Sequence, residues 1–339
     1  MPRKARIDAP GALHHIIIRG IERKVIFKDS QDYSNFLNRL RNVLTETKTP
    51  CFAWALMTNH AHILLRTGYV PLSTVMRRLL TGYAQQFNRR HRRHGQLFQN
   101  RFKSILCEEE PYLLELVRYI HLNPLRAGIV QDLKALKTYP YSGHSVIMGK
   151  LKNDWQHVDY ILKMFGKKVG YARRSYAAFV AKGIDLGRRP DLTGGGLIRS
   201  AGGWSALKAL RSKASRIMGD ERILGSSDFV EAVLKRANED YESKTLAIAK
   251  GLDIDFVVSE VSKHFDIKPE FIKGAGKHRK VSSARSIVCY LAVEKLSIGG
   301  REVARGLGIS PSAVSKAVIR GRSDNHSELI WKEILKIIS

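Results

Sequence analysis

The chain has 339 residues, of which 58 are Lys or Arg and 31 are Asp or Glu, so its formal net charge is +27. This charge indicates a polyanionic partner, and the lack of an amphipathic anchor or lipidation signal favours nucleic acid over a membrane surface. No apolar run approaches the roughly 18 residues of a membrane span, and no signal-peptide core follows Met1, so we expect a cytoplasmic protein. The three cysteines are widely spaced, which excludes a disulfide framework and predicts buried thiols.

The first predicted element is a strand over residues 13–19, which is rich in β-branched side chains. His14 and His15 lie in it. Because they are adjacent, they point to opposite faces, so at most one of them can face a site, and we interpret both as structural residues. A helix follows that is capped by Asp29 and ends near Pro50.

Two further strands, residues 51–57 and 60–66, are predicted to form a hairpin around a Thr-Asn turn. His60 and His62 begin the second of them. Residues two apart in a strand point the same way, so both imidazoles can reach one metal ion. The alternative is a polar strand end.

The next helix starts at Pro71 and carries an apolar stripe from Leu72 to Phe87. Its other face and the run that follows are strongly basic. Such a face is often only solvated, but in this basic chain we expect it to contact DNA phosphates through Arg77, Arg78, Arg89, Arg90, Arg92 and Arg93.

A strand is predicted over residues 96–107, and a helix over residues 110–123 that Pro124 ends. The order of elements is that of an α+β, ferredoxin-like βαββαβ domain with one extra helix. On that helix Tyr119 and Asn123 share a face, since they are four residues apart. A tyrosine on a helix is ordinarily a packing residue, so a nucleophilic role for Tyr119 depends on the other motifs in the sequence.

Taken together, these features resemble the single-tyrosine HUH transposases, and in particular the REP-associated tyrosine transposases. The similarity covers roughly residues 1–150. It lies in the stretches His15-Ile-Ile-Ile-Arg-Gly-Ile-Glu-Arg-Lys-Val-Ile-Phe27, Met57-Thr-Asn-His-Ala-His62, Gly95-Gln-Leu-Phe-Gln-Asn-Arg-Phe-Lys-Ser104 and Tyr119-Ile-His-Leu-Asn-Pro-Leu-Arg-Ala-Gly-Ile-Val130.

The resemblance implies that His60, His62 and Asn123 bind a divalent metal ion and that Tyr119 attacks a DNA phosphate to form a phosphotyrosine link. The mixed nitrogen and oxygen ligands suit Mg²⁺ or Mn²⁺. Zinc is the competitor, but the sequence places no third His, Cys or Asp to complete a tetrahedral site. Glu115 is either a helper at this site or a surface residue.

Residues 151–250 are predicted to form a helical connector. It includes a glycine-rich basic stretch over residues 187–199, and apolar residues predict helices at 204–210 and 229–234. The glycine-rich stretches lack the Lys-Ser or Lys-Thr of a phosphate-binding loop, so we expect no nucleotide cofactor.

Residues 251–339 predict an all-α domain with a helix-turn-helix. Gly306 and Gly308 would allow the turn, and Ser310 and Pro311 would begin the recognition helix. The residues expected to contact DNA are Ser312, Ser315 and Lys316.

This region is similar to the DNA-binding domain of the bacterial replication initiator DnaA. It departs from that family at the signature, where this chain has Ser-Pro-Ser-Ala-Val-Ser, so the initiator's target sequence does not carry over.

The sequence therefore predicts a bacterial, nucleoid-associated, metal-dependent endonuclease and strand transferase. We expect single-stranded hairpin DNA and duplex DNA as its partners. The sequence leaves open whether it is a monomer or a homodimer. One rival is a non-catalytic, sequence-specific DNA-binding regulator. Another is a ferredoxin-like RNA binder, which would be expected to carry an aromatic-rich motif that is missing here.

Overall fold

The computed structural model describes residues 7, 11–68, 70–187, 189, 192, 220–274, 276, 278–296 and 298–338. The chain has two compact units, Met1–Val233 and Leu234–Ser339. The helix predicted at residues 204–210 and most of the glycine-rich stretch 187–199 lie outside the described residues. None of the described helices is long and apolar enough to cross a bilayer.

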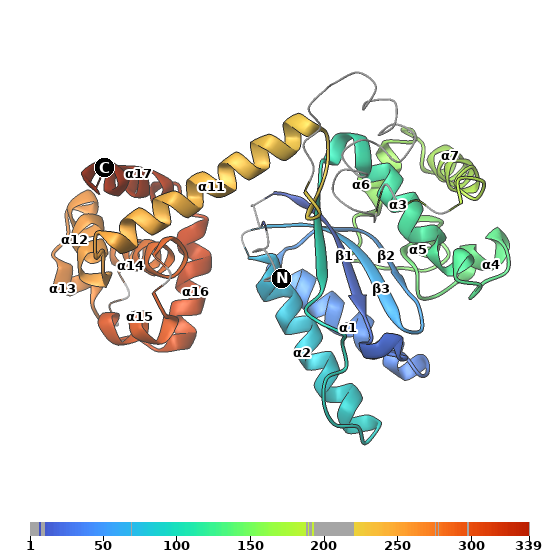
Figure 1. The fold of residues 1–339 in the computed structure, drawn as a ribbon, viewed down its shortest axis with the longest axis horizontal. Helices are drawn as coiled ribbons and strands as arrows, with labels where there is room; N and C mark the ends of the chain where they lie inside the picture. The colour runs from blue at the N-terminus through green and yellow to red at the C-terminus, as the bar shows by residue number, and fades with distance from the viewer. Residues whose placement is uncertain are drawn as a thin grey trace. The chain divides into compact units, whose positions relative to one another are not determined.

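The first unit is built on a five-stranded sheet with the strand order β2-β3-β1-β4-β5 (Figure 1). Its first four strands pair antiparallel with their neighbours. Along the chain they alternate with two helices in the predicted β-α-β-β-α-β order. These elements are β1 (Leu13–Arg19), α1 (Ser30–Thr47), β2 (Cys51–Leu56), β3 (His60–Arg66), α2 (Leu72–Arg90) and β4 (Lys103–Cys107).

Local signals explain where these elements begin. The Asp29 carboxylate caps α1 and accepts hydrogen bonds from the backbone N–H groups of Gln31 and Asp32. The predicted hairpin is confirmed, and the N–H of Met57 donates to the carbonyl of His60 across its turn. As predicted, α2 begins directly after Pro71.

The two faces of the sheet have different covers. On β3, Ala61, Ile63 and Leu65 face a core made with α1 and α2. Leu64 faces the opposite core, which α3 (Glu109–Arg126) and the later helices cover (Figure 1). Because strand residues alternate, His62 lies on the face that α3 covers.

The later helices of this unit complete the second core. They are α4 (Leu133–Thr138), α5 (Gly143–Ile147), α6 (Val158–Lys163) and α7 (Val169–Ala181). Buried residues of α6 and α7, including Ile161 and Tyr176, pack into the same core as α3. The first part of the expected connector is therefore integral to the first unit.

Three predictions for this unit need correction. β4 begins at Lys103 rather than at residue 96, and Phe98 makes only an isolated bridge to Gly20. The helix α3 continues past Pro124 to Arg126, since a proline in the last turn removes only one hydrogen bond. The connector is not all helical, because β5 (Ile223–Leu224) pairs parallel with β4.

The second unit is all helical and has its own core, in which Val258, Ile287, Val303 and Trp331 are buried. The long helix α11 (Ser227–Ala249) leads into it. The other helices are α12 (Ile254–Phe265), α13 (Pro269–Ile272), α14 (Arg279–Tyr290) with a π-helical turn (Leu291–Lys295), α15 (Gly300–Leu307), α16 (Pro311–Arg322) and α17 (His326–Ile338).

The turn between α15 and α16 follows the sequence prediction at most of its residues. Gly308 adopts a left-handed φ of 64° and ends α15. Ser310 caps α16 by accepting a hydrogen bond from the N–H of Ala313, and Pro311 follows as the first helical residue. Gly306, in contrast, lies inside α15, where a Cβ atom would come within 2.9 Å of Ile254.

Candidate active site

Three of the predicted site residues come together on the face of the sheet that α3 covers. The ring centroids of His60 and His62 are 5.4 Å apart, and those of His62 and Tyr119 are 5.8 Å apart. His62 is only 4% exposed. His60 and Tyr119 are half-buried, so the side of the cluster that they form is accessible to solvent.

Strand register and helix packing produce this arrangement. In β3, His60 pairs with Arg19 and His62 pairs with Ile17 of β1, so both imidazoles project on one side. On α3, Leu116, Val117 and Ile120 are fully buried against the sheet. Tyr119 lies between Val117 and Ile120 in the sequence but is only partly buried, so its ring lies at the edge of this packed surface.

The hydrogen bonds of Asn59 determine which nitrogen of His60 carries a proton. The Asn59 amide nitrogen donates to the carbonyl of Arg23 at 2.9 Å, which leaves the amide oxygen as an acceptor. That oxygen lies 2.7 Å from Nδ1 of His60, so Nδ1 must be the donor. The Nε2 atom of His60 therefore has a free lone pair, as a metal ligand requires.

A third histidine belongs to this cluster. His15 of β1 is fully buried, and its Nε2 lies 2.8 Å from Nδ1 of His62. The two rings stack with centroids 5.1 Å apart, and His15 also meets the Tyr119 ring edge-on at 5.9 Å. The sequence favours a structural role for both His14 and His15 and allows at most one of them to face a site, and in the structure His15 is the one that contacts the pair.

The histidines of the pair are uncharged at neutral pH. Burial, with a smaller effect from Arg19, lowers the pKa of His60 to about 4. Burial also holds the pKa of His62 well below its usual range, and the neighbouring His15 and His60 lower it further. Neutral imidazoles are the form that binds metal ions.

Asn123 and Arg126 follow Tyr119 on α3 toward the C-terminal end of the helix. The Asn123 amide nitrogen donates to the carbonyl of Tyr119 at 3.1 Å, which leaves its amide oxygen to act as an acceptor. Arg126 places its guanidinium 5.5 Å from the centre of the Tyr119 ring and donates to the carbonyl of Gly183. Its Nε and one Nη are buried and have no hydrogen-bond acceptor among the described residues.

Burial is also reflected in the pKa of Arg126, which desolvation and the nearby Arg189 and Arg118 lower. The proximity of Tyr119 acts in the opposite direction. A guanidinium that is stripped of water and incompletely hydrogen-bonded favours the approach of an anion.

Glu115, one turn before Tyr119, is occupied elsewhere. Its carboxylate accepts hydrogen bonds from Arg118 at 2.6 Å and from Arg189 at 2.8 Å. Both arginines act together to lower the pKa of Glu115 against the effect of burial. The carboxylate is held in an ion-pair network, which favours the surface role over a role at the metal.

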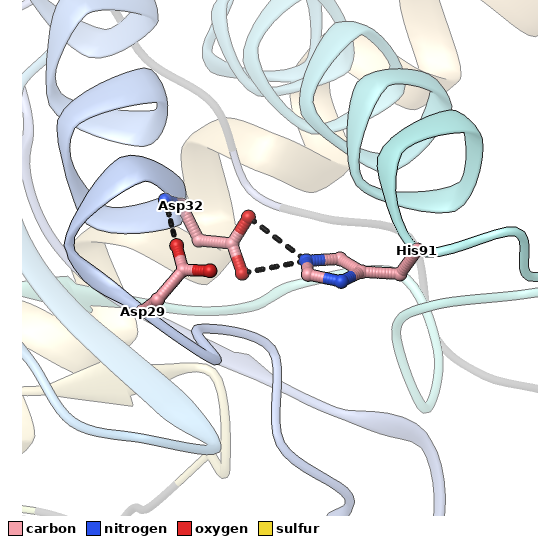
Figure 2. Close-up of side chains that lie close together, drawn as sticks. All are labelled: Asp29, Asp32 and His91. Carbon is pink, nitrogen blue, oxygen red and sulfur yellow. Dashed lines mark hydrogen bonds and ion pairs between the residues drawn. The ribbon is translucent and has the colours of Figure 1, made fainter.

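A separate group of potential metal ligands lies between α1 and α2 among the described residues. It consists of Asp29, Asp32 and His91 (Figure 2). Nε2 of His91 is 2.9 Å from one carboxylate oxygen of Asp32 and 3.1 Å from the other.

These carboxylates already have partners, which argues against a metal ion. Arg90 contacts Asp29 at 2.6 Å and Asp32 at 2.7 Å. Asp29 also caps α1, and Asp32 accepts a hydrogen bond from the N–H of Lys28. A cation here would have to displace a guanidinium, so we assign the group to an ion-pair network that ties the end of α2 to the start of α1.

This network also bears on the predicted phosphate contacts. Arg90 is committed to the two aspartates, Arg78 pairs with Glu46, and Arg93 donates to the carbonyl of Gln96. Of the predicted contacts, Arg77, Arg78, Arg89, Arg90 and Arg92 are exposed and Arg93 is half-buried. Arg77, Arg89 and Arg92 are the exposed ones that these ion pairs do not involve. On α16, Ser312, Ser315 and Lys316 are all exposed.

Sequence reasoning missed His15, Asn59 and Arg126. A signal existed for His15, because pairing β1 beside β3 makes it a diagonal neighbour of His62 on the same face. Parity alone could not choose between His14 and His15. Asn59 was read only as a turn residue, and Arg126 lay beyond the proline at which the helix was expected to end.

Comparison with known proteins finds similarity to a protein family and to a solved structure. Residues 10–123 match the family described as "Transposase IS200 like". No curated protein matches the chain. One solved structure, described as "Structure of the REP associates tyrosine transposase bound to a REP hairpin", is 16% identical; the similarity covers 46% of this chain and 94% of that one, with a TM-score of 0.37. The matched segment, about a third of the chain, contains His15, His60, His62, Tyr119 and Asn123, so the N-terminal part of the chain is similar to IS200-like transposases over the residues that form the site.

Proposed function

We propose that the first unit is a metal-dependent HUH endonuclease and strand transferase that cuts single-stranded, hairpin-forming DNA through a 5′-phosphotyrosine intermediate. The observation that carries this proposal is the position of the Tyr119 ring, 5.8 Å from the ring of His62. A nucleophile beside two neutral imidazoles is the arrangement that the family's chemistry needs. The hairpin substrate is inferred from the resemblance of the sequence motifs to REP-associated tyrosine transposases.

The residues present fit a divalent metal ion. His60 and His62 would hold it through Nε2, and Asn123 would offer its amide oxygen. The ion would draw charge from the scissile phosphate. Mg²⁺ and Mn²⁺ suit this mixture of ligands better than zinc, for which the described residues place no third strong ligand free beside the pair.

In the proposed cleavage step, the hydroxyl of Tyr119 replaces the 3′ oxygen of the DNA on phosphorus. The Tyr119 oxygen forms a bond to phosphorus while the bond to the 3′ oxygen breaks, which leaves a free 3′ hydroxyl and the 5′ phosphate on the tyrosine. The phenol loses one proton in this step and the departing 3′ oxygen takes one up, so the step neither consumes nor releases protons overall. The ester that forms is of the same kind as the one that breaks, so a second hydroxyl can attack it and rejoin the strands without a nucleotide cofactor.

Arg126 supplies positive charge at this point. Its guanidinium lies against the tyrosine ring, and its buried N–H groups lack protein acceptors among the described residues. We propose that it stabilises the negative charge that develops on the phosphate and on the tyrosine oxygen. The exposed Arg77, Arg89 and Arg92 would bind the DNA backbone farther away.

For the second unit we propose duplex DNA binding by a helix-turn-helix. The supporting observation is α16, which follows the capping residue Ser310 and exposes Ser312, Ser315 and Lys316 at its N-terminal end. Base-reading residues occupy this part of a recognition helix.

The test is to incubate the protein with single-stranded DNA from the flanks of its own gene and Mn²⁺. We expect protein joined covalently to a cleaved 5′ end, with the modified peptide containing Tyr119. The rival reading, a DNA-binding regulator without catalytic activity, predicts that DNA is bound but neither cut nor attached.

A further inference from the structure

We propose that His15 is a positioning residue that holds His62 with its Nε2 lone pair free for the metal ion. This inference rests on the function proposed above. It goes beyond that function because it assigns a role to a residue outside the His-x-His pair and on a different strand.

The contact itself is short and shielded from water. Nε2 of His15 lies 2.8 Å from Nδ1 of His62, and the two residues are 0% and 4% exposed. A hydrogen bond between two buried imidazoles has exactly one hydrogen to share, so one ring donates and the other accepts. Solvent cannot substitute for either partner.

The direction of this hydrogen bond determines whether His62 can bind a metal. If Nδ1 of His62 donates to His15, the proton of His62 is on Nδ1 and its Nε2 keeps a lone pair. If His15 donates instead, the proton of His62 moves to Nε2 and the lone pair that a metal needs is lost. Metal binding therefore requires His15 to be the acceptor, as partners of metal-bound histidines commonly are.

The other metal histidine is held in the same way. Nδ1 of His60 lies 2.7 Å from the amide oxygen of Asn59, whose own orientation is fixed by Arg23. Each member of the pair thus has its Nδ1 engaged, by a side chain from the turn in one case and from the neighbouring strand in the other. Both Nε2 atoms are left for one cation.

The contacts of His15 differ from those of a residue that only packs in the core. It stacks on His62 and meets Tyr119 edge-on, so one buried ring sets the position of a ligand and of the nucleophile. Its neighbour His14 provides the matched comparison. His14 is equally buried in β1, but it faces the other way and contacts Ser104 at 3.0 Å.

The test measures Mn²⁺ binding by calorimetry or electron paramagnetic resonance, without DNA, on the full chain. His15→Phe keeps an aromatic ring but cannot accept a hydrogen bond, and we expect it to weaken Mn²⁺ binding by about 10- to 100-fold. His15→Gln can accept through its amide oxygen and should recover most of the loss. His14→Phe, the control for disturbance of β1, should bind Mn²⁺ as the wild type does.

A second measurement does not depend on whether the variants fold. Long-range ¹H–¹⁵N spectra of the Mg²⁺-saturated wild-type protein should place the proton of His62 on Nδ1. A proton on Nε2 of His62 would overturn the inference. So would wild-type Mn²⁺ affinity in a folded His15→Phe variant, or an equal loss in His14→Phe.

These outcomes separate the inference from the proposed function. If wild type and His15→Phe bind Mn²⁺ equally and wild type still forms the covalent adduct, only the role of His15 is refuted. If wild type neither binds Mn²⁺ nor forms an adduct, the proposed function fails and the role of His15 fails with it.

Discussion

Replacing Tyr119 by phenylalanine removes the oxygen that we propose as the nucleophile and keeps the ring that packs against His15, His62 and Arg126. Because Tyr119 is only half-buried, we expect Tyr119→Phe to change the free energy of unfolding by no more than about 1 kcal/mol. Cleavage should fall by at least about 10³-fold, and the covalent adduct should disappear, as expected for loss of a nucleophile.

Tyr83 offers a matched control, because the same substitution there should lower stability and leave the adduct intact. It is 1% exposed in the core between the sheet, α1 and α2, on the face away from the site, and its hydroxyl donates to the carbonyl of Ile26. Tyr83→Phe leaves that buried carbonyl without this donor, which costs about 1–3 kcal/mol. We expect a lower melting temperature, by roughly 2–4 °C per kcal/mol, with the adduct retained.

The assay is a denaturing gel with end-labelled single-stranded DNA and Mn²⁺, run beside thermal unfolding of each variant. A third variant, Tyr112→Phe, should behave like wild type in both. An adduct that persists in Tyr119→Phe, or a phosphotyrosine mapped to another position, would refute the assignment of the nucleophile. Loss of the adduct in Tyr83→Phe at full folding would show that the assay reports stability rather than chemistry.

Four further outcomes are expected. His60→Ala should abolish Mn²⁺-dependent cleavage while a gel shift still shows hairpin binding, and a chelator should reproduce this in the wild type; cleavage by a folded variant would make the histidine structural. Arg126→Gln should slow cleavage by on the order of 10²-fold with little change in DNA affinity, and an unchanged rate would remove its proposed role. Lys316→Ala should weaken binding of duplex DNA at low salt, and duplex binding that is indifferent to this change would argue against a role for Lys316. Burial lowers the pKa of His144 from 6.5 to about 4, so protonation of this residue in the unfolded chain favours unfolding as the pH falls from 6.5 toward 4. The free energy of unfolding measured in urea should fall over this range by on the order of 3 kcal/mol on account of His144. His144→Gln should reduce this pH dependence, and an unchanged pH dependence would argue against the contribution of His144.

The parts of the fold that could be predicted are those with a local cause. The cap at Asp29, the hairpin around Thr58 and the start of α2 after Pro71 each follow from a few neighbouring residues, and the structure confirms them. The capped start of α16 at Ser310 belongs to the same class. The alternation of β3 likewise predicted that His60 and His62 share a face.

The parts that could not be predicted depend on partners that are distant in the sequence. β5 has only two residues and exists because β4 offers it an edge, so no periodicity reveals it. Residues 97–102 contain apolar side chains that fit a strand, but only Phe98 finds a bridging partner there. The role of His15 depends on register across two strands, which the sequence of either strand alone does not determine.

The geometry of the site also favours an enzyme over a DNA-binding regulator. A protein that only grips DNA needs cations on its surface, and the exposed Arg77, Arg89 and Arg92 would serve that purpose. DNA binding alone does not require a guanidinium such as that of Arg126, whose buried N–H groups lack acceptors among the described residues, since such a group destabilises the fold. Nor does it need a pair of neutral histidines whose Nδ1 atoms are hydrogen-bonded to neighbouring side chains, as those of His60 and His62 are. Arg126 and the hydrogen bonds to His60 and His62 are explained if a phosphate and a metal ion bind beside Tyr119. We therefore favour the hypothesis that the first unit is an enzyme.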